Sequence, residues 1–376
     1  MAIGFVKKDK QRDSWYYEAT LGVDENGKRI RKKKRFETKK EAQQALADLL
    51  SAANKGDYVE PSRVLYMDYL TDWLDSKKIS VRESTWKSYN DWVRLHIIPA
   101  LGDLEISKIT PQRVEKFMLE LSKNNYAGST MQKIYTIIKD SLNKAERWQM
   151  VSKNVVDPVD RPKATKEEML LWDNEQSLTF LKHAKADRLY VAFLLALTTG
   201  MRQGEILGLR WKDVDLETGI LYVKQALSHD GRKFSSLPKT AASRRSITIP
   251  DKVIGDLKRH KSMIAEEKRA CGQSYKDNNL VVCTTLGTPQ SPRNLNRTFQ
   301  RLLKTVDVPK IRFHDLRHTH ATLLLVQGVN PKVVSERLGH ATIKITLDTY
   351  THVLPSLQKD VAEEFGKSFF KSTVNE

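Results

Sequence analysis

Cysteine and long apolar runs are scarce in this sequence. Only two cysteines are present, Cys271 and Cys283, too few for a disulfide framework and without the spacing of a metal cluster, so we expect a reducing, cytoplasmic setting. No apolar run reaches the roughly 18 residues that a membrane-spanning helix needs. The N-terminus is already charged at Lys7, which argues against a signal peptide.

Acidic residues are outnumbered by basic ones. The chain holds 64 lysines and arginines against 46 aspartates and glutamates, a formal net charge of +18. An excess of this size predicts a polyanionic partner, and nucleic acid is the first candidate because no basic helix has a membrane-seeking pattern. The 376 residues are enough for two or three domains, each with a hydrophobic core.

The first part of the chain, residues 1–60, is predicted to form a three-stranded β-sheet followed by a helix. Two short strands precede an Asn26-Gly27 turn signal, and a capping box of Thr38 and Glu41 starts the helix. We expect the third strand to meet DNA phosphates, with a merely solvated strand or a nuclear localisation signal as alternatives. Its basic residues are Lys28, Arg29, Arg31, Lys32, Lys33, Lys34 and Arg35.

Residues 61–155 show helical periodicity throughout, with aromatic residues at helical spacing that are most simply core. Basic residues lie between these aromatic positions and could meet a DNA backbone. Prolines and charges in the next stretch, 156–166, are typical of an interdomain linker. The sequence therefore predicts a second, all-helical domain that ends at this linker.

Residues 167–355 form the largest predicted domain, of mixed α+β character. A nearly all-apolar helix over 188–199 must be buried, and short strands are expected at 220–226 and 245–249. The tail, 356–376, carries phenylalanines that could dock on a neighbouring chain. The predicted fold class is thus multi-domain and mainly α-helical, with small β-sheets.

Histidine, arginine and tyrosine gather between residues 314 and 350. His314 and Arg317 are three residues apart in a predicted helix, so they share a face and can converge on one ligand. His340 and Tyr350 follow further along the chain. A pocket built from such residues suits a phosphate, because the charges bind the oxygens and the phenol can attack phosphorus.

Two other interpretations of this cluster remain open. Each residue taken alone could be an ordinary surface or half-buried side chain. His314 and His318 are also four residues apart, like the ligands of a helical zinc motif. That motif needs a glutamate where this chain has the shorter Asp315, and Arg317 would place positive charge beside the metal. No clear third ligand is evident elsewhere in the sequence.

A further arginine, Arg202, follows directly after the buried helix and the glycine that ends it. Glu205 lies three residues on and could hold the guanidinium in place, which makes Arg202 a candidate for a fixed functional residue. Lys239 lies in a polar connection, 235–243, that could swing it into the pocket. A lysine in such a loop is more often plain surface.

Together these motifs resemble the tyrosine recombinase (phage integrase) family. The resemblance is carried by Arg202 in Thr-Gly-Met-Arg-Gln-Gly-Glu, His314-x-x-Arg317-His318, Leu338-Gly339-His340 and Tyr350 ten residues later. It covers the whole predicted catalytic domain. The helical domain resembles the core-site binding domain of the family, and the first sixty residues resemble the arm-binding domain of integrases from phages and conjugative elements. An enzyme that integrates and excises a mobile element is therefore expected.

The resemblance implies a role for each matched residue. Tyr350 would attack the scissile phosphate, giving a 3′-phosphotyrosyl link and a free 5′-hydroxyl. Arg202 and Arg317 would bind the non-bridging oxygens. Lys239 would be the general acid, with Lys224 and Lys233 as alternatives nearby in the sequence.

His314 would act as acid or base toward the tyrosine, and His340 would hydrogen-bond the phosphate. Glu205 and His318 are interpreted as supports behind these residues, and His320 and His352 as bystanders. Neither a metal nor ATP would be required, because the covalent intermediate conserves the energy of the phosphodiester bond.

The implied partners are double-stranded DNA, at core and arm attachment sites, and further copies of the chain, as a tetramer in the synaptic complex. An excisionase and a host DNA-bending protein are further candidates, in the cytoplasm of a bacterial cell at its nucleoid. Three rival functions stay open: a type IB topoisomerase that relaxes supercoils with little sequence demand, a zinc hydrolase, which a chelator would inactivate, and a DNA-binding protein without activity.

Overall fold

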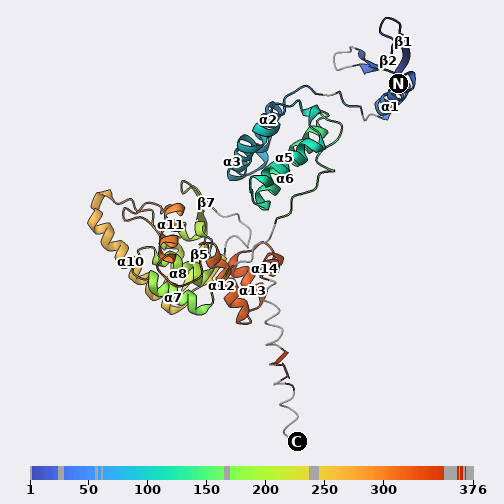
Figure 1. Cartoon of the computed structure of the whole chain (residues 1–376). Helices are drawn as coiled ribbons and strands as arrows, with labels where there is room; N and C mark the ends of the chain where they lie inside the picture. Colours follow the sequence, from blue (N-terminus) through green and yellow to red (C-terminus); the bar gives the residue numbers. More distant parts are fainter. Residues whose placement is uncertain are drawn as a thin grey trace. The chain divides into compact units, whose positions relative to one another are not determined.

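The computed structural model describes residues 2–23, 29–55, 58–60, 62–164, 170–236 and 245–350, together with residues 362, 363, 365, 366 and 369 of the tail. The chain divides into two compact units, Met1–Glu167 and Glu168–Glu376, and each is described by itself (Figure 1). Lys28, Lys239 and His352 lie outside the described residues. Among those described, no helix is long and apolar enough to cross a membrane.

The N-terminal sheet has three antiparallel strands in the order β1-β2-β3, as predicted. They are β1 (Ile3–Asp9), β2 (Ser14–Val23) and β3 (Arg29–Phe36), followed by helix α1 (Lys39–Lys55). The predicted capping box is present, since Thr38 Oγ1 accepts from the Glu41 backbone N–H at 3.2 Å. Tyr17, Ala19 and Leu46 form a small core between the sheet and α1.

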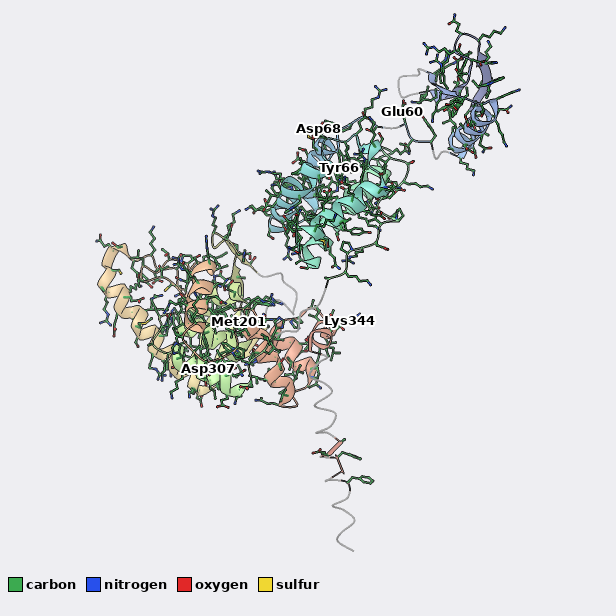
Figure 2. The ribbon with its side chains drawn as sticks, viewed as in Figure 1. Glu60, Tyr66, Asp68, Met201, Asp307 and Lys344 are labelled. Atoms are coloured by element: carbon green, nitrogen blue, oxygen red, sulfur yellow. The ribbon has the colours of Figure 1, made fainter. Side chains whose placement is uncertain are left out.

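The next part of the first unit is helical, as predicted. Its main helices are α2 (Tyr66–Ser80), α3 (Glu83–Trp92), α5 (Pro111–Lys123) and α6 (Gly128–Arg147), with the short α4 (Ile98–Leu101) between α3 and α5. Tyr66, Tyr69 and Trp73 are almost fully buried, so the aromatic periodicity of α2 does mark a core. Figure 2 shows the side chains of this group of helices around the labelled Tyr66.

Most of the predicted linker packs on the helical group instead of running free. Val156 and Val159 are buried in its core, and Tyr135 on α6 donates to the Val159 carbonyl at 3.0 Å. Gln132 donates to the Pro162 carbonyl at 2.7 Å. The prolines did indicate a stretch without regular structure, but the two valines anchor it. Residues 156–162 thus belong structurally to the helical group.

The second unit is of mixed α and β character. Its helices are α7 (Asn174–Ala184), α8 (Tyr190–Thr199), α9 (Gln203–Leu207), α10 (Asp251–Cys271), α11 (Pro292–Leu303), α12 (Asp315–Val326), α13 (Pro331–Leu338) and α14 (Ile343–Tyr350). A sheet of order β4-β5-β8 comprises β4 (Val214–Asp215), β5 (Ile220–Val223) and β8 (Arg245–Thr248). A hairpin pairs β6 (Gln225–Leu227) with β7 (Phe234–Ser236).

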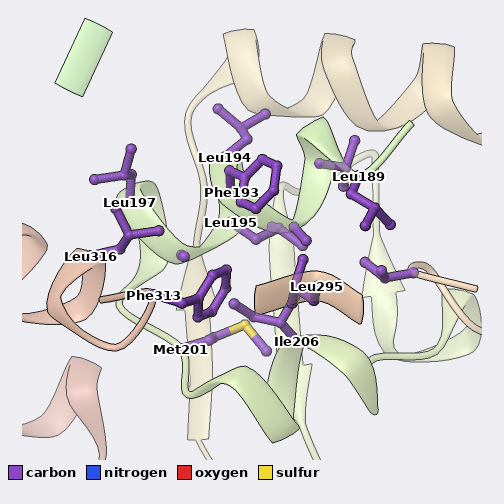
Figure 3. Close-up of a cluster of buried hydrophobic side chains, with 14 of the residues drawn as sticks. Leu189, Phe193, Leu194, Leu195, Leu197, Met201, Ile206, Leu295, Phe313 and Leu316 are labelled. Atoms are coloured by element: carbon purple, nitrogen blue, oxygen red, sulfur yellow. The ribbon is translucent and has the colours of Figure 1, made fainter. Parts of the chain in front are cut away.

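Helix α8 lies in the core of this unit, as its apolar sequence predicts. Figure 3 shows Phe193 of α8 near Phe313 and Met201 in that core. Phe299 of α11 contacts both phenylalanines, with ring centroids 5.7 and 5.8 Å apart. This packing fixes the two segments that leave the core toward the candidate site, one after α8 and one before α12.

Gly200 determines how the chain leaves α8. It adopts a left-handed conformation with φ of 65° and ends the helix. A Cβ atom added there would lie 2.5 Å from Leu338 and 2.7 Å from His320, so a larger residue would clash as well as strain the backbone. The close approach of α12 and α13 to this turn therefore depends on a glycine.

Replacing Phe299 with alanine should destabilise the second unit by about 3–5 kcal/mol, because it removes a fully buried ring from the aromatic core. Urea unfolding followed by tryptophan fluorescence would measure the change. Phe234→Ala is the matched control: this ring is 39% exposed, so we expect a loss of about 1 kcal/mol or less. Equal losses in the two variants would contradict this account of the core.

Candidate active site

Arg202 is fixed at the start of α9 by the carboxylate of Glu205. Its backbone N–H donates to Glu205 Oε2 and its Nη1 to Oε1, both at 2.9 Å. The Arg202 side chain is 44% exposed, whereas that of Glu205 is 3% exposed. The structure therefore places the predicted acid beneath the predicted arginine and leaves the guanidinium accessible to a ligand.

Glu205 is shared with a second arginine, Arg245, at the start of β8. Arg245 Nη2 donates to Glu205 Oε2 at 2.8 Å and Nη1 to Oε1 at 3.2 Å. Burial alone would raise the pKa of Glu205, but the hydrogen bonds from Arg245 and the charges of both arginines lower it to about 2. The carboxylate is therefore ionised at neutral pH.

Arg317 lies in the first turn of α12 and is buried. Its Nη1 donates to the Gly200 carbonyl at 2.6 Å and its Nη2 to the Leu338 carbonyl at 2.8 Å. Arg202 Nη2 reaches the neighbouring Gly339 carbonyl at 3.2 Å. The two predicted arginines come from distant parts of the sequence, and the structure brings them together at the end of α13.

His340 follows this end of α13 directly. Its Nδ1 is 2.8 Å from the hydroxyl of Thr346, a fully buried residue of α14. Burial lowers the pKa of His340 to about 4, with the positive charges of Arg317 and Arg202 as further causes. His340 is therefore neutral at physiological pH in the absence of an anion.

His314 and His318 pack edge to face at the start of α12, with ring centroids 5.0 Å apart. Partial burial, then the charge of Arg317, lowers the pKa of His314. Burial, then the charge of His314, lowers the pKa of His318 to about 4. Across the described part of the chain, no group of three or more His, Cys, Asp or Glu side chains could hold a metal ion. The zinc interpretation thus lacks a third ligand there.

Tyr350 is the last residue of α14. It lies four residues after Thr346, about one helical turn further along the helix from the residue that contacts His340.

Of the three candidate lysines, Lys224 forms an ion pair outside this site, since its Nζ lies 2.9 Å from Asp213. Lys239 belongs to the part of the chain that the structure does not describe.

His320 is buried and its two ring nitrogens are both engaged. Nδ1 donates to the Leu197 carbonyl at 2.8 Å, and Nε2 accepts from Arg337 Nε at 3.1 Å. The Arg337 guanidinium also donates to the carbonyls of Thr198 and Thr248. Both ring nitrogens of His320 are therefore used within the protein, where the ring helps to attach α13 to α8.

The sequence analysis missed Arg245 and Arg337. One local signal could have indicated Arg245: it alternates with Ile247 and Ile249, two inward residues of the same segment. An arginine at an inward position of a strand must find a buried partner. No comparable local signal exists for Arg337, whose partners lie 17 to 139 residues away in the sequence.

Three family models match the chain in order. They are the arm DNA-binding domain at residues 5–53, the N-terminal SAM-like domain of phage integrases at 66–122 and the phage integrase family at 171–356.

Individual relatives match the chain over nearly its whole length. A tyrosine recombinase XerC-like protein of Caldanaerobacter subterraneus is 32% identical, and the alignment covers 97% of this chain and 98% of the relative. The ICEBs1 integrase of Bacillus subtilis is 27% identical over 95% of this chain and 98% of its own length.

Solved structures share the fold at lower identity. The Tn1549 transposon integrase in complex with a circular intermediate DNA has a TM-score of 0.68 at 20% identity, covering 79% of this chain and 99% of the other. A lambda integrase tetramer bound to a Holliday junction has a TM-score of 0.60 at 19% identity, covering 92% and 94%.

The expected family and fold class are therefore confirmed. Three domain models in sequence order and a full-length relative above 30% identity show that this chain belongs to the phage integrase family of tyrosine recombinases, the site-specific enzymes that exchange DNA strands.

Proposed function

We propose that Arg202, Arg317, His314 and His340 bind the scissile phosphate and that Tyr350 attacks it. The observation that carries this proposal is the meeting of the two arginines on adjacent carbonyls directly before His340. The guanidiniums of Arg202, Arg245 and Arg317, with the carboxylate of Glu205, give this cluster a net charge of +2 when its histidines are neutral. Such a cluster favours the negative charge that grows on the phosphate oxygens in the transition state.

The proposed reaction is a transesterification in which each bond is accounted for. The Tyr350 oxygen forms a bond to phosphorus as the 5′ oxygen leaves. The phenolic proton passes to His314, which is neutral and can accept it, and the leaving oxygen takes a proton from Lys239. Lys224 forms an ion pair with Asp213, which supports Lys239 over Lys224 as the general acid. The reverse attack by a 5′-hydroxyl of another strand completes the exchange.

The N-terminal sheet is proposed to bind arm-site DNA through one of its two faces. Lys32 is paired with Ala19, and Lys34 with Tyr17; both partners are buried against α1, so these lysines lie on the helix side. Residues on the other face alternate with them. They are Arg29, Arg31, Lys33 and Arg35 of β3, with Ile3 and Phe5 of β1, which are 66% and 52% exposed.

Two contacts support the open face as the DNA-binding one. Lys33 lies over the ring of Tyr16 at 4.0 Å and pairs with Glu18 at 2.8 Å, so its ammonium is held above the sheet. We therefore narrow the predicted DNA contacts of the basic strand to Arg29, Arg31, Lys33 and Arg35.

We propose that residues 1–60 bind arm sites, that the helical group from 61 to 164 binds core sites and that 167–355 catalyse strand exchange for a mobile element. The tetramer of lambda integrase on a Holliday junction supports a tetramer here. An excisionase and a host DNA-bending protein are proposed as further partners, in the bacterial cytoplasm. Phe365 and Phe369 of the tail are exposed, which supports a contact between protomers.

Tyr350→Phe should abolish the covalent intermediate without weakening binding, because it removes only the attacking oxygen. A nicked suicide duplex from the DNA flanking the integrated element would be incubated with protein in EDTA and run on a denaturing gel. A protease-sensitive shifted band with wild type alone is expected. A band with Tyr350→Phe would disprove the nucleophile, and no band with either protein despite salt-sensitive binding would favour a non-catalytic DNA-binding protein.

Matched double variants test the two faces of the sheet. Arg31→Ala with Lys33→Ala should reduce the slope of log affinity against log salt by about 2 on DNA from the element's ends, because two phosphate contacts are lost. Lys32→Ala with Lys34→Ala removes the same charge from the helix side and should leave the slope nearly unchanged. Equal effects would show that net charge, and not the face, determines binding.

The neutral histidines predict an acid-sensitive fold. Between about pH 6.5 and 4 the unfolded chain binds protons at His318 and His340 that the folded protein does not, so stability falls as pH falls through this window. The urea midpoint of the DNA-free protein would measure this. His318→Gln should flatten the dependence, whereas His229→Gln, at an exposed histidine of the same unit, should not. A midpoint independent of pH here would contradict the burial of both rings.

A further inference from the structure

Arg245 uses all three of its side-chain nitrogens inside the protein. Its side chain is 5% exposed, and it opens strand β8 six residues after Lys239 in the sequence. Two nitrogens donate to Glu205, and Nε donates to the Arg337 carbonyl at 2.7 Å. A buried guanidinium with every nitrogen engaged is held in one orientation.

Each oxygen of the Glu205 carboxylate accepts one hydrogen bond from Arg202 and one from Arg245. Oε1 accepts from Arg202 Nη1 and Arg245 Nη1, and Oε2 accepts from the Arg202 backbone and Arg245 Nη2. A buried carboxylate paired with Arg202 alone would cancel its charge. With Arg245 present the group of three keeps a net charge of +1, so Arg202 still presents positive charge to a ligand.

Arg245 also belongs to a row of arginines at the end of α13. Three consecutive carbonyls there each accept from a different arginine: Arg337 O from Arg245, Leu338 O from Arg317 and Gly339 O from Arg202. The last carbonyls of a helix have no partner within it and carry partial negative charge. The row therefore sets the position of α13 relative to both phosphate-binding arginines and to His340.

We infer that Arg245 is a positioning residue for strand exchange: it orients Arg202 through Glu205, and it fixes the segment that leads to His340 through the Arg337 carbonyl. This inference rests on the role proposed above for Arg202. Because all three side-chain nitrogens of Arg245 already donate within the protein, we assign it no contact with the phosphate. It acts on the reaction only through the residues it holds.

The test compares the full-length protein on two suicide duplexes from the DNA flanking the element, one with the natural scissile phosphate and one with a neutral methylphosphonate there. Arg245→Gln should slow formation of the covalent intermediate about 100-fold on the phosphate, as loss of a preorganised donor does. On the methylphosphonate, Arg245→Gln should form the covalent intermediate less than about tenfold more slowly than wild type, because the charge that Arg202 stabilises is absent. DNA affinity should change little.

Arg188→Gln is the matched control. Arg188 also makes a two-point ion pair, with Glu267 at 2.7 and 2.6 Å, and donates to a backbone carbonyl, that of Cys283. This pair lies between α10 and the start of α8, so any effect of the variant comes through stability. Its loss of rate should be equal on the two duplexes.

Two further variants keep the test decisive if Arg245→Gln folds poorly. Arg245→Gln combined with Glu205→Gln removes the two buried charges together, so no buried carboxylate is left with Arg202 as its one remaining arginine partner, yet the double variant should show the same dependence on substrate charge. Arg245→Lys keeps the charge but loses the planar guanidinium that donates to both oxygens of Glu205, so it should recover only part of the rate lost in Arg245→Gln. Folding of each variant would be checked by its urea midpoint.

Arg202→Gln distinguishes a failure of the proposed phosphate site from a failure of the proposed positioning role of Arg245. If it cleaves the natural phosphate at the wild-type rate, the proposed phosphate site is wrong, and this inference fails with it. If Arg202→Gln cleaves slowly, the phosphate site stands. If Arg245→Gln then cleaves at the wild-type rate, or loses the same factor in rate on both duplexes, Arg245 is merely structural. Slow cleavage by both variants, relieved on the methylphosphonate, supports the inference.

Discussion

The C-terminal end of α13 is the point on which the candidate site depends. Helix α13 ends at Gly339, which has a left-handed φ of 68°, and the carbonyls of residues 337–339 accept from Arg245, Arg317 and Arg202. Because the acceptors are backbone atoms, the arrangement requires the helix to end there and not any particular side chain. His340 comes next and is placed by the same turn.

Electrostatics explain why such a site needs support from within the protein. Guanidiniums close together repel one another, and the shared carboxylate of Glu205 offsets part of that repulsion for Arg202 and Arg245. Burial, together with the remaining positive charge, lowers the pKa of His340 and keeps it neutral. Positive charge is thus already in place at this site before any ligand binds, and preorganised charge of this kind assists phosphoryl transfer in general.

The three parts of the chain have separate hydrophobic cores. The N-terminal sheet buries Tyr17 and Ala19 against α1, and this leaves its other face to residues such as Arg31 and Lys33. The helical group has its own core and includes residues 156–162 through Val156 and Val159. Each of these cores is formed by residues of its own part of the chain.

The sequence by itself determined what depends on short spacing: the three-stranded sheet, the Thr38–Glu41 cap, the buried α8, the family, and the neighbouring positions of His314, the N-cap residue of α12, and Arg317 in its first turn. Only the tertiary structure decided which side chains support them. Arg245 meets Glu205 across 40 residues and the Arg337 carbonyl across 92, and Arg317 meets Gly200 across 117. Periodicity and caps report on neighbours within a few turns, whereas these contacts exist only after the core has brought α8, β8, α12 and α13 together.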